Sequence, residues 1–323
     1  MRRQPLNLSV PCGIFYLSNL QLSNLPTFQL SPSLPVIIYL MFHIVPPAPV
    51  DYLVIGHLTV DRTSAGSTLG GSVAYAALTA RALGLRVGIV TAWGNEIPLT
   101  ALGDIPVIAA NAEHSTTFEN IYTATGRTQY IRHVAPKINF ALIPEHWRHA
   151  GIVHLAPVAQ EMEPLLPAAF RPAFTGITPQ GWFRAWGADG LVHPCLWPQS
   201  DEALSHATAT VLGLEDVGGD EELIEHMAHH TPLLVVTEGA AGSRLFWHGD
   251  SRRFRPPAVT EVDATGAGDI YATAFFIRLT QTRDPWEAAR FATRVAAISV
   301  TRPGLQGVPT PAEVGECLTE VLQ

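Results

Sequence analysis

An aspartate stands at the start of a long apolar run, directly after two glycines and an alanine. The string is Asp263-Ala264-Thr265-Gly266-Ala267-Gly268-Asp269, and residues 270–276 continue it with apolar side chains. Small residues let the backbone approach a ligand closely, and the free amides and dipole of a helix start attract an anion. An anion cradle with a carboxylate at its edge suits phosphoryl transfer to a hydroxyl, with Asp269 as general base. The structural alternative is a tight helix entry in which Asp269 only complements the helix dipole.

Composition excludes several classes of protein. With 323 residues, 47% hydrophobic and 15% charged, the chain is long enough for one large α/β domain or two smaller ones. A net charge of −8 argues against a nucleic-acid partner. Lys137 is the only lysine, which excludes a Gly-x-x-x-x-Gly-Lys phosphate loop and leaves a Schiff-base enzyme a single candidate.

Cysteines and histidines point to no clear metal site. Cys12, Cys195 and Cys317 are widely spaced, as expected for reduced thiols of a cytoplasmic protein. His226 and His230 would share one face of a helix, so a metal site is conceivable there. We favour a solvated helix end, where histidines complement the dipole.

Residues 1–50 differ from the rest of the chain. They hold no acidic residue and are rich in proline, serine and leucine. The apolar run 35–45 is too short for a membrane span and lacks a good cleavage site after it. We expect this extension to be disordered or a start-site artefact, with the functional protein beginning near Met41 and no stable membrane association. A weak membrane anchor is the alternative.

From residue 51 the pattern predicts parallel βαβ winding. An apolar strand (51–57), the Gly70-Gly71 turn, a helix (72–83) and a second strand (86–91) follow one another. Alternating runs at 116–122 and 128–134 predict a hairpin with one wet face. Further strands are predicted at 151–155, 174–177, 208–212 and 233–237, and capping residues predict late helices from 285 and 311.

The string 263–269 resembles the Asp-Thr-x-Gly-Ala-Gly-Asp motif of the ribokinase-like (PfkB) sugar kinases, with Ala264 in place of the usual threonine. The resemblance covers residues 51–323 and implies an α/β three-layer sandwich with a mostly parallel central sheet. It implies that Asp269 takes the proton of the acceptor hydroxyl and that the amides of Gly266, Ala267 and Gly268 hold the phosphate. ATP would be the donor, Mg²⁺ its partner ion, and a sugar or polyol the acceptor.

On the acceptor side, Gly70-Gly71 resembles the family's glycine pair, and Asp61 lies where such kinases place a carboxylate for sugar hydroxyls. Tyr75 falls where ribokinases have asparagine, which argues against ribose. The interval from Asp61 to Gly70 looks too short for the lid strands that ribokinases insert there. We therefore expect a β lid reduced to the single hairpin near 116–134, and a monomer rather than a dimer clasped through a fuller lid.

On the donor side, Thr237-Glu238-Gly239-Ala240-Ala241-Gly242 resembles the family's Thr-x-Gly-x-x-Gly turn, although a plain hairpin turn explains it as well. Gly304 lies in a segment similar to the adenine loop, and Thr265 would join it in binding the nucleotide. Asp263 is a candidate for holding a monovalent cation. Asp216 could keep the acidic role near magnesium of a degraded Asn-x-x-Glu motif.

The acceptor stays open. The segment 177–181 and the hairpin look similar to inositol-kinase-like members, which hints at a cyclic polyol. One alternative is a kinase of the same fold that acts on a nucleoside or another small alcohol. Another is a catalytically silent sugar-binding regulatory protein, which the degraded motif favours and the intact Asp269 opposes.

Overall fold

One large sheet organises the molecule. The computed structural model describes residues 14–16, 48–64, 66–123, 126–170 and 173–322, and in them ten strands form a sheet of order β1-β6-β5-β2-β9-β10-β13-β14-β15-β16. Neighbours are parallel up to β14, and β15 and β16 are added antiparallel. The strands are β1 (Ile14–Tyr16), β2 (Tyr52–Ile55), β5 (Val87–Trp93), β6 (Val107–Asn111), β9 (Ile152–Leu155), β10 (Phe174–Ile177), β13 (Ala209–Gly213), β14 (Leu233–Thr237), β15 (Ser243–Trp247) and β16 (Asp250–Phe254).

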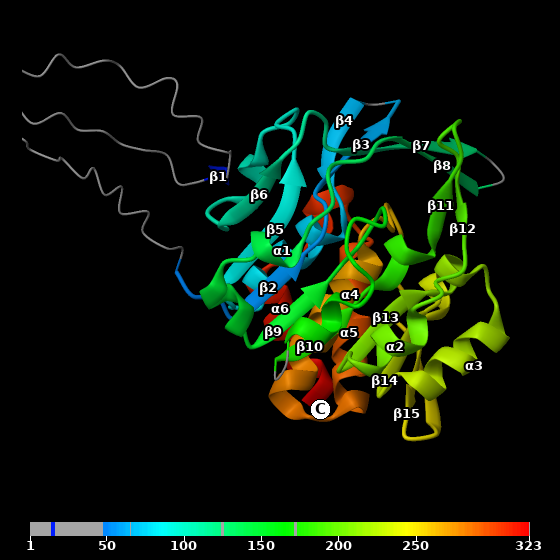
Figure 1. The fold of residues 1–323 in the computed structure, drawn as a ribbon. Helices are drawn as coiled ribbons and strands as arrows, with labels where there is room; N and C mark the ends of the chain where they lie inside the picture. Colours follow the sequence, from blue (N-terminus) through cyan, green and yellow to red (C-terminus); the bar gives the residue numbers. More distant parts are fainter. Residues whose placement is uncertain (1–13, 17–47, 65, 124–125, 171–172, 323) are drawn as a thin grey trace, which may run out of the picture.

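Both faces of this sheet are covered by helices, which gives three layers (Figure 1). In β2, Tyr52 and Val54 belong to one core cluster, whereas Leu53 and Ile55 belong to another, as the two-residue repeat of a strand requires. The first cluster includes residues of α1, α4, α5 and α6, and the second includes residues of α2 and α3. The helices are α1 (Ser72–Ala82), α2 (Ser200–Ser205), α3 (Glu221–His230), α4 (Ala267–Thr282), α5 (Pro285–Ser299) and α6 (Pro311–Leu322). The prediction of an α/β three-layer sandwich is therefore confirmed.

A second, four-stranded sheet of order β4-β3-β7-β8 forms the lid at one end of the molecule (Figure 1). Its strands are β3 (Thr59–Thr63), β4 (Gly66–Gly70), β7 (Thr116–Thr123) and β8 (Gly126–His133). A short hairpin of β11 (Arg184–Trp186) and β12 (Val192–Pro194) adjoins it, because Ile131 of β8 donates its N–H to the carbonyl of Gly190 at 2.8 Å.

The prediction of a lid made of one hairpin was wrong. The interval between Asp61 and Gly70 holds most of β3 and β4, which are five residues long and separated by only two residues. Antiparallel strands can be joined by such a short turn, so the interval is long enough for two lid strands. The expectation of a monomer, which depended on a reduced lid, loses this support.

The other predicted elements agree with the structure to within two residues at most ends, including the hairpin of β7 and β8 and the helices that begin at Pro285 and Pro311. The prediction for residues 1–50 falls mostly outside the described residues and stays a prediction. Within the described part of the chain, no helix is long and apolar enough to span a bilayer.

Candidate functional site

The predicted anion cradle opens α4. Gly266 adopts a left-handed conformation (φ 78°) as the N-cap residue, which favours glycine at this position. The Ala267 N–H donates to the carbonyl of Ala264 at 3.1 Å, so this amide has a partner within the loop. Among the described residues, the amides of Gly266 and Gly268 have no protein acceptor, and a side chain at Gly268 would meet open space. Two of the three predicted donors are thus free to bind an anion.

Asp269 lies half-buried in the first turn of α4, beside this open space. Burial and the nearby carboxylates of Asp216 and Asp61 raise the pKa of Asp269 to about 6, against the opposing effects of a hydrogen bond with Ser72 and the charge of Arg184. Such a carboxyl group is charged at neutral pH yet poorly solvated, which makes it a better proton acceptor than an exposed aspartate.

A chain of buried polar groups, which reaches into the central sheet, holds the backbone of Asp269. The Thr273 hydroxyl donates to the Asp269 carbonyl at 2.9 Å, and the Tyr52 hydroxyl donates to Thr273 Oγ1 at 3.4 Å. The Tyr52 oxygen lies 2.8 Å from His154 Nδ1, and burial lowers the pKa of His154 to about 3, which keeps its ring neutral. Side chains of β2 and β9 thereby hold the first turn of α4 in place.

The acceptor-side residues meet Asp269 at the base of the lid. Asp61 of β3 accepts a hydrogen bond from the Thr59 hydroxyl at 2.9 Å. A side chain at Gly70 would come within 2.1 Å of an Asp61 carboxylate oxygen, so glycine is needed there to leave room for that carboxylate. Gly71 has φ 89°, and a side chain on it would lie 2.6 Å from the His57 carbonyl. The glycine pair therefore serves the close packing of β3, β4 and the start of α1.

Tyr75 packs against the start of α4. Its buried ring packs against Gly266, where a side chain would come within 2.3 Å of a ring carbon. Its hydroxyl lies 3.9 Å from the position that a side chain on Gly304 would take. The ring therefore forms a wall between the cradle and the loop of Gly304.

Asp216 is brought towards Asp269 by the end of β13. Its carboxylate accepts hydrogen bonds from the Gln180 side chain at 2.9 Å and from the Gly213 N–H at 2.8 Å. Burial raises the pKa of Asp216, although the charge of Arg184 and these hydrogen bonds oppose the shift. Thr237, which ends β14, is paired with Gly213 in the sheet, so the donor-side strand end adjoins Asp216.

Sequence reasoning missed Arg184. This residue begins β11, is half-buried, and acts electrostatically on both Asp269 and Asp216. Its guanidinium donates to the Val158 carbonyl at 3.3 Å and lies 5.4 Å from the centre of the Phe118 ring. No motif or spacing marks it in the sequence. Ser72, also missed, directly follows Gly70-Gly71 at the start of a predicted helix, which was a usable signal.

The loops predicted to bind the nucleotide are held by backbone hydrogen bonds. Although burial opposes it, hydrogen bonds from Thr265 and Gly304 lower the pKa of Asp263. The carboxylate of Asp263 accepts from the Thr265 N–H at 2.9 Å and the Gly304 N–H at 2.8 Å, so it ties the cradle to the Gly304 loop. Its predicted role towards a monovalent cation stays a prediction.

The Thr237–Gly242 turn has a structural requirement for at least one of its glycines. A side chain at Gly242 (φ 99°) would lie 1.9 Å from the Phe254 carbonyl, so only glycine fits between β15 and β16 there. Gly239 (φ 56°) has open space around it, as a ligand-facing position would.

A large cavity lies elsewhere. Its volume is about 790 Å³, and its lining includes Phe174, Leu233, Leu279 and Arg283, at the amino ends of parallel strands and the C-terminal end of α4. Ligands of open α/β sheets bind beyond the carboxyl ends of the strands, which is the end where Asp269 lies. We therefore assign the candidate site to the Asp269 end.

The sheet, the lid and the loop before α4 define the class as a ribokinase-like α/β protein. The sequence model of the pfkB family carbohydrate kinases matches residues 202–312. Bacillus subtilis ribokinase is 34% identical over 128 residues, which cover 38% of this chain and 43% of that protein. Over residues 202–312 the chain is thus similar to the pfkB family of carbohydrate kinases.

Solved structures agree on the fold. A pyrophosphate-dependent kinase of the ribokinase family, complexed with a pyrophosphate analog and myo-inositol, superposes with a TM-score of 0.66 at 20% identity and covers 82% of this chain and 99% of its own. Arabidopsis thaliana ribokinase complexed with ribose and ATP gives 0.64 at 18% identity, covering 84% and 99%. The matches to the first four curated relatives span only 39–57% of their lengths.

Proposed function

We propose that this protein is a kinase that transfers the terminal phosphoryl group of ATP to a hydroxyl of a sugar or cyclic polyol. The observation that carries the proposal is Asp269: a carboxyl group with a pKa raised to about 6, next to two unpartnered amides at a helix start. The match of residues 202–312 to the pfkB family model supports the reaction class.

In the proposed step the acceptor O–H gives its proton to a carboxylate oxygen of Asp269. The acceptor oxygen forms a bond to the terminal phosphorus while the bond from phosphorus to the bridging oxygen breaks, and ADP leaves with that electron pair. The amides of Gly266 and Gly268, the helix dipole and the charge of Arg184 act on the phosphoryl oxygens as negative charge redistributes.

Asp216 fits the predicted magnesium role as an outer ligand. Its oxygens each accept one hydrogen bond and keep a lone pair, so they can hold a water of a hydrated ion. Magnesium supplies charge neutralisation on the donor phosphates when it is bound. A hydrogen bond from Gln180 to Asp216 orients the carboxylate for this purpose.

For the acceptor we favour a cyclic polyol. Asp61 offers a carboxylate to hydroxyl groups at the base of the lid, and Phe118 of β7 and Arg184 lie near each other on the same side. The relative that was solved with myo-inositol shares the fold and supports this choice of acceptor.

The test is turnover by Asp269→Asn with ATP or pyrophosphate as donor and with ribose, fructose, cytidine or myo-inositol as acceptor. Loss of the base should lower turnover by roughly 10²–10⁴-fold. Binding of ADP, measured by calorimetry, should persist because the cradle is made of backbone. Glu222→Gln is the matched control, since it removes an exposed acid from the first turn of α3.

Undiminished turnover by Asp269→Asn would exclude the proposed base. Turnover with pyrophosphate alone would replace the donor and keep the role of Asp269. A polyol that raises the melting temperature of the wild-type protein without any release of ADP or phosphate would favour the silent sugar-binding protein.

A further inference from the structure

A cluster of two histidines and an aspartate lies outside the kinase site. Asp201 is in the first turn of α2, and His226 and His230 are one turn apart on α3. One ligand atom from each of the three lies within 4.8 Å of the other two, the only such group found among the described residues. The three side chains are between 40 and 49% exposed, so an ion could reach them from solvent.

The ligand atoms lie close enough together to bind one ion. Nε2 of His226 lies 2.9 Å from Asp201 Oδ1, and Nε2 of His230 lies 3.6 Å from Asp201 Oδ2. Ligand atoms at zinc distances in a tetrahedron stand about 3.3–3.5 Å from one another. The two observed distances end on different oxygens of Asp201, so this carboxylate lies within reach of both imidazoles. A bound ion would replace the hydrogen bond between His226 and Asp201.

A hydrogen bond fixes the ring nitrogen that His230 presents. Its Nδ1 lies 2.9 Å from the carbonyl oxygen of His226. Because a carbonyl oxygen can only accept, Nδ1 carries the hydrogen, and the neutral ring presents a lone pair at Nε2. Metal-binding histidines are commonly oriented in this way, with the second nitrogen bonded to a carbonyl.

His229 provides an internal comparison. Its Nδ1 also donates to a carbonyl, that of Glu225 at 2.6 Å, but its ring is not part of the three-residue group. The cluster is thus defined by where the rings of His226 and His230 point, together with an aspartate brought in from another helix.

We propose that Asp201, His226 and His230 bind a divalent transition-metal ion, with zinc the best fit, and that the ion links α2 to α3. Two imidazoles and one carboxylate leave a fourth position for water. Magnesium and calcium prefer sets made of oxygen ligands and are not expected here.

The two helices that the ion would link lie on either side of β13 and the turn that carries Asp216. α2 ends just before β13, and α3 begins soon after the turn that carries Asp216. An ion bound by both helices would hold the two ends of this strand-and-turn segment. Metal binding would therefore stabilise the part of the chain that positions Asp216, at a distance from the reacting groups.

The experiment is a calorimetric titration of Zn²⁺ into the full chain, expressed without a histidine tag and freed of metal with a chelator. We expect binding of one ion and a higher melting temperature with Zn²⁺ than with Mg²⁺. Co²⁺ should give the visible absorption of a tetrahedral site, and Zn²⁺ should displace it.

The double variant His226→Gln/His230→Gln should weaken Zn²⁺ binding by on the order of 100-fold and abolish the Co²⁺ absorption. His229→Gln, on the same exposed helix end, should leave both unchanged. Equal affinity of the double variant and the wild type, or the absence of the tetrahedral Co²⁺ absorption from the wild type, would overturn the proposal.

Discussion

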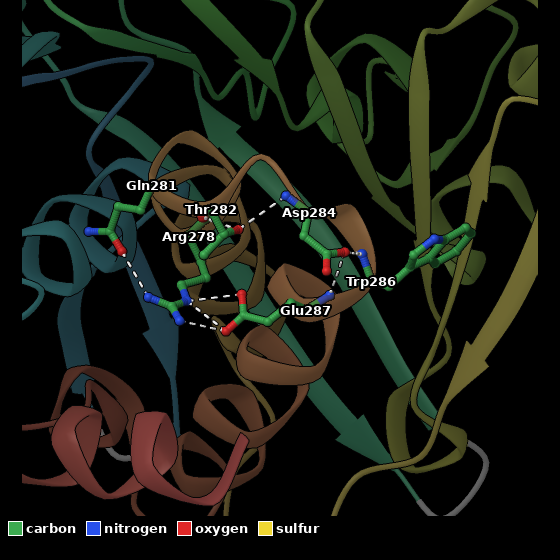
Figure 2. A network of polar contacts seen from close by, with 6 residues as sticks. All are labelled: Arg278, Gln281, Thr282, Asp284, Trp286 and Glu287. Atoms are coloured by element: carbon green, nitrogen blue, oxygen red, sulfur yellow. Dashed lines mark hydrogen bonds and ion pairs between the residues drawn. The ribbon is translucent and has the colours of Figure 1, made fainter. Parts of the chain in front are cut away.

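The charged side chains at the two ends of α4 differ in how they are paired. At the C-terminal end Arg278 and Glu287 are mostly buried and form several hydrogen bonds at 2.6–3.0 Å, which tie α4 to α5. Asp284 caps α5 by accepting from the N–H groups of Trp286 and Glu287 (Figure 2). Every charge in this network faces an opposite charge or a donor.

At the N-terminal end, carboxylates outnumber the positive groups that act on Asp269. Asp269 is half-buried near Asp216 and Asp61, and among these groups only Arg184 is positive. Burial of like charges near one another costs stability. The N-terminal end of α4, with its excess of carboxylates, is therefore the end where a bound ligand or ion can supply positive charge.

Among the variants that follow, the largest effect is expected from removing Arg184, the positive charge that acts on Asp269. Arg184→Gln should lower kcat/KM by roughly 10²–10³-fold, because the positive charge proposed to act on the phosphoryl oxygens is lost. It should also move the acid limb of the pH–rate profile upward, since Arg184 now opposes the rise in the pKa of Asp269. Rates with the proposed donor and acceptor, measured from pH 5 to 8, test both effects.

Arg132→Gln is the control for this variant. Arg132 lies in β8 of the lid, where it pairs with Glu119 on the surface. We expect its loss to leave the rate and the profile unchanged. An Arg184→Gln protein with wild-type kcat/KM would show that its charge does not act on the reaction.

The region around Asp269 shows which features could be predicted from the sequence. The helix start at Ala267 was predictable because its information is local: small residues and an acid within seven positions, followed by a long apolar run. The βαβ pattern was predictable for the same reason, since apolar runs and glycine turns mark each element where it stands.

Local sequence patterns alone did not predict the neighbours of Asp269: the family resemblance placed Asp61 and Asp216 at the site, and Arg184 was missed. Asp61, Arg184 and Asp216 come from three segments more than 50 residues from it, and they meet because of the strand order and the lid. Hydrophobic periodicity says which residues are buried but not which strand ends become neighbours. The strands β3 and β4 were missed because their outer halves are exposed and their turn is short.

A second prediction concerns the ion pair at the C-terminal end of α4. Glu287→Gln leaves Arg278 mostly buried without its carboxylate, which should lower the free energy of unfolding by about 3 kcal/mol. Urea unfolding measures the change. Replacing both residues, as Arg278→Leu/Glu287→Leu, should recover part of the loss because no buried charge is then left unpaired. Unchanged stability of Glu287→Gln would mean that water already screens this pair.

The smallest expected effect is the pH dependence of the contribution that Asp269 makes to the free energy of unfolding. The pKa of Asp269 is higher in the folded protein (about 6) than its ordinary value of 3.8. The folded state therefore binds the proton more tightly, so the charged carboxylate costs stability at pH values above 6, and this cost vanishes below pH 3.8.

Asp269→Asn should accordingly be more stable than the wild type at pH 7.5, by about 2 kcal/mol after allowance for the partial exposure of the group. The difference should shrink as the pH falls from 6 to 4. Removal of an ion-paired carboxylate would give a difference of the opposite sign, with the variant less stable than the wild type at pH 7.5. Urea unfolding of both proteins at several pH values measures it. A variant less stable than the wild type at pH 7.5 would mean that Asp269 is structurally satisfied like the residues at the other end of α4, and that the two ends do not differ in kind.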